Sequence, residues 1–408
     1  LPAAGWGEKD GTVTNSERRI SRQRPFLPLP GEARPDWWII KEVAKRLGHG
    51  AAFSYFSPGQ IFAEHVALSG FENDGSRDFD LSGLSGADYE TMTPVQWPVR
   101  SKPTARMFGD GKFFTTDGKA RFLPVQPPPP FAPAPGQFIL NTGRVRDHWH
   151  TMTRTGKASR LSAHMAEPFV EVHPADANAL GIRRANLVRL TNRHGSALVR
   201  ALVTDRQQRG QLFVPMHWTD QFASNGRVDT LVTGKTDPVS GQPALKMAQV
   251  HAEPVGVRLY GFLVAAQKPA LGTDYWALAP APHGYRAEIA LFEEPADWSD
   301  FLADTFGTDA VFQSIRDERS GRRAFVLVEN GRLLAALYTS PDPVLVSRQW
   351  AVDLLSETDL TASIVLAGRP GADRPDGGAI VCSCMGVGIN TITEAVPRHG
   401  CTSVEAVG

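Results

Sequence analysis

The sequence predicts a mixed α/β protein with a small β-barrel near its middle. Between residues 136 and 255, short runs of alternating apolar and polar residues recur, each bounded by turn-forming residues. Runs whose apolar residues repeat every four positions, as in a helix, lie outside this region. Several short strands at regular spacing are typical of a barrel, so we expect strands in the middle of the chain and helices on either side.

Residues 1–123 predict a helical region with loops. A helix is expected to begin at Asp36, because apolar residues recur every four positions as far as Leu47 and a glycine follows. A second helix is expected over 58–68. Residues 108–114 place a Gly-Asp-Gly turn between aromatic residues, which predicts a hairpin.

A proline-rich linker follows over residues 124–135. It holds seven prolines, four of them in the run Pro127–Pro130. Such a segment is extended and semi-rigid, and we place a domain boundary there.

Residues 136–255 predict the barrel. A helical turn that ends at Gly181 interrupts the strands, and a turn at His194-Gly195 joins two of them. The expected strands are 138–140, 169–172, 186–190, 196–203 and 211–215.

Residues 256–378 predict an α+β region. Asn330-Gly331 between two apolar runs, 323–328 and 333–338, indicates a hairpin, and an amphipathic helix is expected over 343–356. No catalytic constellation is visible here, so a scaffold or docking role is expected.

The tail, residues 379–408, begins with a strand over 379–381. Asn390 is expected to cap a helix that runs to about Val396, where Pro397 would end it early, and Gly400 can close it. Thr402 with Glu405 three residues later has the pattern of a capping box, which predicts a further helix. We expect that helix to continue in a longer chain.

Composition excludes several classes of protein. The 408 residues suit two or three domains, and Lys+Arg and Asp+Glu both number 43, which argues against nucleic acid or an anionic membrane as partner. No apolar run approaches the roughly 20 residues of a membrane span. Three cysteines cannot form a disulfide framework and suit a reducing compartment.

Residues 141–151 combine hydroxyl, cationic and aromatic side chains in one short stretch. It follows the apolar strand 138–140 and offers threonine hydroxyls, Arg144 and Arg146, two imidazoles and an indole. These groups suit a ligand with phosphates and flat heterocycles. A surface loop with solvated charges remains the alternative.

Cys382 and Cys384 form the second candidate site. One residue apart in an extended segment, their sulfurs lie on the same side and could bind one metal ion. A cluster or a closed zinc site needs four ligands, and the place of Cys401 before the capping box suits packing better. The pair could also be core residues.

Residues 142–151 resemble the dinucleotide-binding segment of bis-molybdopterin-guanine-dinucleotide oxidoreductases, in particular the nitrate reductase branch. Three further stretches agree, in the order of that family. They are 1–8 with 14–19, resembling the end of its molybdopterin domain; 217–225 with 236–238 and 245–247, resembling its cofactor barrel; and 382–384 through 401–406, resembling the bacterioferritin-associated-ferredoxin type of [2Fe–2S] module.

The resemblance implies a fold. Residues 1–123 would form the C-terminal part of the α/β molybdopterin oxidoreductase domain, and 124–135 the linker. Residues 136–255 would form a double-psi-type dinucleotide-binding β-barrel, followed by the α+β region over 256–378. Residues 379–408 would be a truncated [2Fe–2S] module, of the kind that some cytoplasmic assimilatory nitrate reductases carry.

The resemblance also implies a function: reduction of nitrate to nitrite at molybdenum held by a bis(molybdopterin guanine dinucleotide) cofactor. His217, or Trp218 beside it, would lie near the cofactor. Cys382 and Cys384 would supply half the ligands of the electron-entry [2Fe–2S] cluster, and no catalytic residue is assigned in this chain. The cofactor-binding residues would be Thr142, Gly143, Arg144, Val145, Arg146, Asp147, His148, Trp149, His150, Thr151, His217, Asn225 and Lys246.

Some parts of the family's pattern are not in these 408 residues. They are the cysteines of its N-terminal [4Fe–4S] cluster, the cysteine that binds molybdenum and a second pair of [2Fe–2S] ligands. We therefore expect a fragment of a longer cytoplasmic enzyme, inactive alone and reduced by an NADH-dependent flavoprotein or a ferredoxin. The alternatives are a non-catalytic cofactor-binding or electron-transfer scaffold, and another enzyme of this class such as a formate dehydrogenase.

Overall fold

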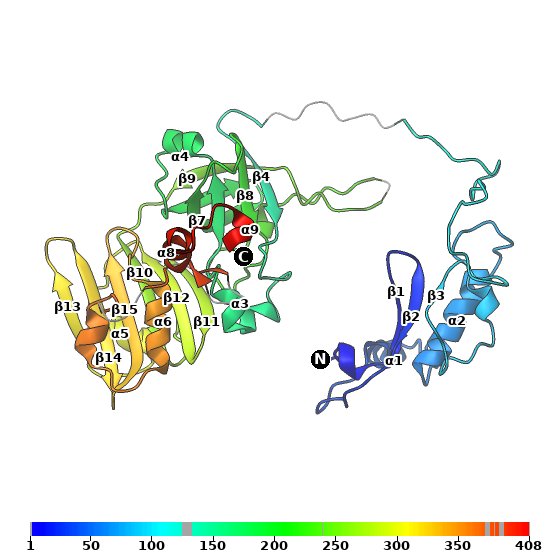
Figure 1. The fold of residues 1–408 in the computed structure, drawn as a ribbon, viewed down its shortest axis with the longest axis horizontal. Helices are drawn as coiled ribbons and strands as arrows, with labels where there is room; N and C mark the ends of the chain where they lie inside the picture. Colours follow the sequence, from blue (N-terminus) through cyan, green and yellow to red (C-terminus); the bar gives the residue numbers. More distant parts are fainter. Residues whose placement is uncertain are drawn as a thin grey trace. The chain divides into compact units, whose positions relative to one another are not determined.

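A computed structural model describes residues 2–124, 133–238, 240–371, 376–378, 380–382 and 387–407 (Figure 1). The chain divides into two compact units, Leu1–Pro129 and Pro130–Gly408, which are described separately. This division falls inside the predicted linker, most of which lies outside the described residues.

The first unit is a small sheet with two helices. Strands β1 (Gly11–Thr14), β2 (Arg19–Gln23) and β3 (Val95–Gln96) form an antiparallel sheet in that order. Helices α1 (Asp36–Arg46) and α2 (Pro58–Gly70) confirm the two predicted helices. The core of this unit is formed by Ile20, Phe62, Val66, Leu81 and Val99.

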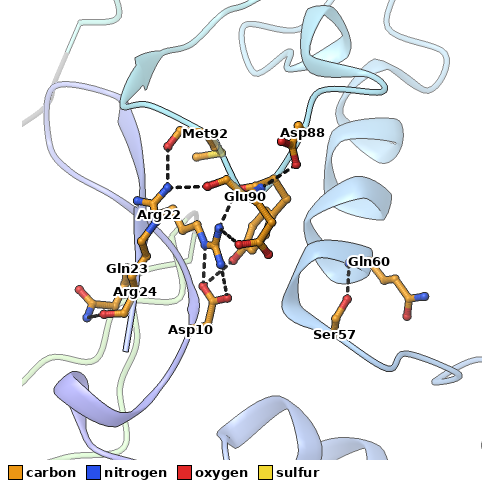
Figure 2. A network of polar contacts seen from close by, with 10 residues as sticks. Asp10, Arg22, Gln23, Arg24, Ser57, Gln60, Asp88, Glu90 and Met92 are labelled. Carbon is orange, nitrogen blue, oxygen red and sulfur yellow. Dashed lines mark hydrogen bonds and ion pairs between the residues drawn. The ribbon is translucent and has the colours of Figure 1, made fainter. Parts of the chain in front are cut away.

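One buried arginine ties the segments of this unit together (Figure 2). The Arg22 guanidinium donates to Asp10 at 2.8 Å and to Glu90 at 2.8 Å, and lies 4.3 Å from the centroid of the Tyr89 ring. Burial, together with a hydrogen bond to Asp10, raises the pKa of the Tyr89 hydroxyl to about 12. The Arg22 guanidinium thus joins residues that lie more than 60 positions apart in the sequence.

The predicted hairpin over 108–114 is wrong. These residues form turns, and the rings of Phe108 and Phe113 stack with centroids 4.7 Å apart. The two aromatic rings pack on each other across the turn. Their apolar character therefore does not indicate a strand that faces a core.

The second unit begins with a closed barrel, as predicted; it has six strands, of which β9 was not predicted. The order around the barrel is β4-β8-β5-β7-β6-β9. Two neighbouring pairs, β4 with β8 and β5 with β7, are parallel, and the other pairs are antiparallel. Short helix α4 (Pro174–Leu180) ends at Gly181 in the left-handed conformation, also as predicted. The strands are β4 (Phe138–Gly143), β5 (Phe169–Val172), β6 (Leu187–Asn192), β7 (Gly195–Val203), β8 (Gln211–Pro215) and β9 (Ala248–Pro254).

An antiparallel sheet of six strands follows the barrel, in the order β11-β12-β10-β15-β14-β13. The predicted hairpin is present, with Asn330 and Gly331 both at positive φ between β14 and β15. The strands are β10 (Leu259–Ala265), β11 (Tyr275–Ala281), β12 (Gly284–Leu291), β13 (Gln313–Asp317), β14 (Arg322–Glu329) and β15 (Arg332–Ser340).

Helices cover both faces of this sheet (Figure 1). Helix α5 (Trp298–Phe306) packs on the face that includes Leu263 and Leu337. Helix α6 (Arg348–Asp353), the 3-10 turn η5 (Leu354–Ser356) and α7 (Ala362–Leu366) pack on the opposite face with Phe262 and Val264.

The predicted helix over 343–356 is shorter than expected. It begins at Arg348, because Pro343 cannot extend a helix and Ser347 caps it with its hydroxyl accepting from the Trp350 amide. Its last turn is the 3-10 turn η5.

The tail forms a two-stranded ribbon and two helices. Strand β16 (Ile380–Cys382) pairs with β17 (Val387–Gly388), so the predicted strand is confirmed from Ile380 onward. Helix α8 (Ile389–His399) closes at Gly400 as predicted, but Asn390 lies inside it and Pro397 does not end it.

The last helix, α9 (Val404–Val407), is also present. Ser403 caps it by accepting from the Ala406 amide at 3.3 Å, so Thr402 is not the capping residue. Within the described residues, no helix is long and apolar enough to cross a membrane.

Candidate functional site: a cation-bearing loop at the end of β4

The candidate loop leaves the barrel where two parallel strands end together. Gly143 at the end of β4 pairs with Pro215 at the end of β8. Because the strands are parallel, the segments that follow them emerge at the same rim. The barrel topology therefore delivers His217 beside the loop that begins at Arg144.

His217 fastens this loop at two points. Its Nδ1 donates to the carbonyl oxygen of His150 at 2.7 Å, and its Nε2 accepts from the amide of Val145 at 2.9 Å. A carbonyl can only accept and an amide can only donate, so these partners require the neutral Nδ1–H tautomer. Burial lowers the pKa of His217, in keeping with that neutral form.

Asp147 and His148 also turn inward. The buried Asp147 carboxylate accepts from His164 Nδ1 at 2.7 Å and from Arg146 at 3.0 Å. The buried ring of His148 lies between the Thr155 hydroxyl and the Met165 carbonyl, and burial lowers its pKa. These side chains are buried and form hydrogen bonds within the chain, which hold the loop in place.

Four other side chains of the loop point into solvent: those of Arg144, Trp149, His150 and Thr151. The Arg144 guanidinium lies 4.8 Å from the centroid of the Trp149 ring. Among the described residues, no carboxylate pairs with Arg144. The loop thus presents a cation and a flat ring together, which suits an anionic ligand with a heterocycle.

The first two loop residues serve packing. The buried Thr142 hydroxyl donates to the carbonyl oxygen of Leu245 at 3.0 Å, which places the 245–247 segment beside the end of β4. Gly143 lies against Phe213, whose ring would be 2.7 Å from an added Cβ.

Lys246 lines a cavity of about 570 Å³, which is a second candidate feature of the site. Arg193 and Lys235 line the same cavity, and none of these three cations forms an ion pair within the described part of the chain. Three unpaired cations around one hollow suit a phosphate group.

The sequence did not indicate Arg193 and Lys235 as site residues. They come together because the Asn192 side chain donates to the carbonyls of Leu231 and Gln249, which joins three distant segments. No spacing in the sequence predicts that junction.

The structure does not bring Asn225, a predicted cofactor-binding residue, to the loop. Its carbonyl accepts from Leu198 of β7, and no hydrogen bond within the described residues joins it to the loop. Trp218, the other residue expected near the cofactor, is buried and packs in the core shared by barrel and sheet.

The tail ribbon lies beside the loop. Arg146 Nη2 donates to the carbonyl of Val381 at 3.3 Å, one residue before Cys382. Cys384 and the side chain of Cys382 lie outside the described residues. Cys401 is half-buried and its thiol donates to the Ala406 carbonyl at 3.4 Å, in keeping with the packing role expected for it.

Two segments of the chain match known protein families. Residues 138–249 match the family described as molydopterin dinucleotide binding domain, and residues 1–46 match the molybdopterin oxidoreductase family. The first match spans most of the barrel, and the second spans the beginning of the first unit.

Among its relatives, this chain is homologous to nitrate reductases. It is 38% identical to the nitrate reductase of Klebsiella oxytoca over all of this chain and 47% of that protein. It is 34% identical to the assimilatory nitrate reductase catalytic subunit of Bacillus subtilis, over 62% of this chain and 36% of that one. The putative formate dehydrogenase YrhE of Bacillus subtilis is 35% identical over 63% of this chain and 25% of its own length. The chain spans about half or less of the length of these curated relatives.

Proposed function

We propose that this chain serves in a molybdenum-dependent, assimilatory nitrate reductase, as the part that binds the guanine dinucleotide of the pterin cofactor. The observation that carries the proposal is the match to a nitrate reductase along the whole chain, combined with a barrel loop whose exposed groups are a cation and an indole.

The residues present fit one dinucleotide of the molybdenum bis(molybdopterin guanine dinucleotide) cofactor. Arg144 and Trp149 offer a charge for phosphate and a plane for a base. Lys246, with Arg193 and Lys235, offers a second group of cations at the segment that Thr142 holds against β4. When bound, the cofactor would supply oxygen-atom transfer at its molybdenum.

In this proposal the loop residues divide into two groups with different roles. His217, Asp147 and His148 hold the loop, and their mutation changes its shape. Arg144, Trp149 and Lys246 face the ligand directly. Asn225 remains a proposed contact that the barrel alone does not bring to the loop.

We further propose that the tail receives electrons. Cys382 and Cys384 would supply two ligands of a [2Fe–2S] cluster. The hydrogen bond from Arg146 to Val381 supports this role, since it sets the cysteine-bearing strand against the cofactor loop. The donor would be an NADH-dependent flavoprotein or a ferredoxin, and an assimilatory role would place the reaction in the cytoplasm.

A second candidate function is formate oxidation, which the similarity to a putative formate dehydrogenase favours. A third is a non-catalytic scaffold that binds the cofactor. The purified full-length product, with molybdenum and iron measured, should be assayed for nitrate-dependent oxidation of a reduced viologen dye and for formate-dependent reduction of an oxidised one.

Turnover with nitrate alone supports the proposal. Turnover with formate instead would transfer the assignment to the formate enzymes. A protein that holds the pterin dinucleotide and turns over neither substrate would support the scaffold.

A further inference from the structure

A cluster of buried charges lies between the barrel and the six-stranded sheet. On the barrel side, Glu167 accepts from Arg200 at 2.9 Å and from the Tyr275 hydroxyl at 2.8 Å. On the sheet side, Glu288 accepts from Arg348 at 2.7 and 2.9 Å. These two carboxylates and two guanidinium groups balance each other.

Arg286 adds a third guanidinium group to this cluster. It lies on β12 two residues before Glu288, so both side chains point to the same face of the sheet. Its exposed fraction is 9%, and within the described part of the chain it makes no hydrogen bond and no ion pair. An arginine does not lose its proton in a protein, so the buried cation needs an anion.

The neighbouring Arg348 cannot share its partners. Besides its two bonds to Glu288, it donates to the carbonyls of Val344 and Val346, both at 2.7 Å. Its donors are therefore occupied by this chain, whereas those of Arg286 are available.

Arg286 lines a cavity of about 390 Å³, together with Arg348, Ser347 and His164. Asp376 is the acidic residue on its wall. The Asp376 carboxylate accepts from the Ser347 hydroxyl at 2.8 Å and from the Gly378 amide at 3.0 Å, and forms no ion pair with Arg286. His164 hydrogen-bonds to Asp147 of the loop that follows β4, so this cavity adjoins that loop.

We propose that this cavity is a binding site for a small monovalent oxyanion, such as a carboxylate or nitrate, with Arg286 as its principal partner. A guanidinium fork binds the two oxygens of such an anion side by side. The anion would pair with the Arg286 guanidinium and join the sheet to α6. This site is separate from the proposed dinucleotide site and does not depend on it.

The test is thermal unfolding of the full chain, titrated with sodium nitrate and, separately, sodium acetate at constant ionic strength. We expect the unfolding midpoint to rise with the logarithm of the anion concentration once that exceeds the dissociation constant, by roughly 2–3 °C at about ten times that constant. Arg286→Met should abolish this rise, and should unfold no earlier than the native chain without anion, since it removes an unpaired buried cation.

Three further variants sharpen the test. Arg286→Lys keeps the charge without the fork and should weaken binding about tenfold or more. Asp376→Asn should tighten it several-fold by removing a nearby negative charge. Arg332→Met, at an exposed arginine of β15, should respond to anions as the native chain does.

Two results would overturn the proposal. One is an equal anion response in the native and Arg286→Met chains, which would mean a general salt effect. The other is an Arg286→Met chain that unfolds well below the native one while neither responds to anions. That outcome would make Arg286 a structural counter-charge to Glu288. Because no step uses the cofactor, a failed nitrate assay leaves this test unaffected.

Discussion

The Nε2 of His217 accepts the amide of Val145 at 2.9 Å, across the rim where β4 and β8 end side by side. The same ring donates to the carbonyl of His150, so one imidazole holds both ends of a six-residue turn in the loop that follows β4. His150 and Met152 both have positive φ, so the loop adopts a conformation that needs support from outside itself.

Replacing this ring should loosen the loop. His217→Ala leaves the amide and the carbonyl without their partner and should lower the free energy of unfolding by about 1–3 kcal/mol. Urea unfolding measures this, with His194→Ala, at an exposed histidine, as the control. Equal stability of the two variants would show that His217 does not hold the loop.

Stability should also fall in mild acid. Burial lowers the pKa of both His148 and His217, so the unfolded chain takes up protons first as the pH drops. Their stabilising contribution is therefore complete above the unfolded pKa of about 6.5, and it is lost as the pH falls through their folded values. Unfolding at pH 7.5 and 5.5 should show this loss, and His217→Gln, which cannot take up a proton, should reduce it. An unchanged pH dependence in that variant would contradict the assignment.

Gly143 should not tolerate a side chain. In Gly143→Ala the new Cβ would lie 2.7 Å from Phe213, so the end of β4 must move. We expect a loss of about 1–3 kcal/mol in the free energy of unfolding. Gly272→Ala is the matched control, because its Cβ would meet nothing within 4 Å. If both variants unfold together, the contact with Phe213 does not restrict this strand end.

The buried pair of Glu288 and Arg348 should matter more than an exposed pair. Glu288→Gln leaves the partly buried Arg348 without its carboxylate and should cost about 2–4 kcal/mol. Glu318→Gln, which breaks an exposed pair with Arg316, should change the midpoint of unfolding little. Similar losses in both variants would mean that burial adds nothing to the first pair.

Local patterns in the sequence predicted five strands of the barrel and the hairpin of β14 and β15, but they did not predict β9 to β13. The turn residues Asn330 and Gly331 and the alternation along β7 reflect backbone and burial rules that act over a few residues. The same rules failed at Phe108 and Phe113, where two aromatic rings stack on each other and bury no strand.

The sequence predicted where the site lies, but not which of its side chains face inward and which face solvent. The sequence indicated the loop, yet it could not separate His148, which faces inward, from Trp149, which faces out. Arg193 and Lys235 were missed because only the fold brings them to Lys246. Contacts between distant segments depend on strand register, which a single sequence does not state.

The central claim, that the barrel loop binds a guanine dinucleotide, is tested most directly by calorimetric titration of guanosine diphosphate into the full chain. We predict saturable binding that guanosine, which lacks phosphates, does not reproduce. Arg144→Ala should weaken it by about 1–3 kcal/mol, or roughly 5- to 150-fold, while Arg332→Ala leaves it unchanged. No saturable binding, or equal affinity in the Arg144→Ala and native chains, would contradict the account.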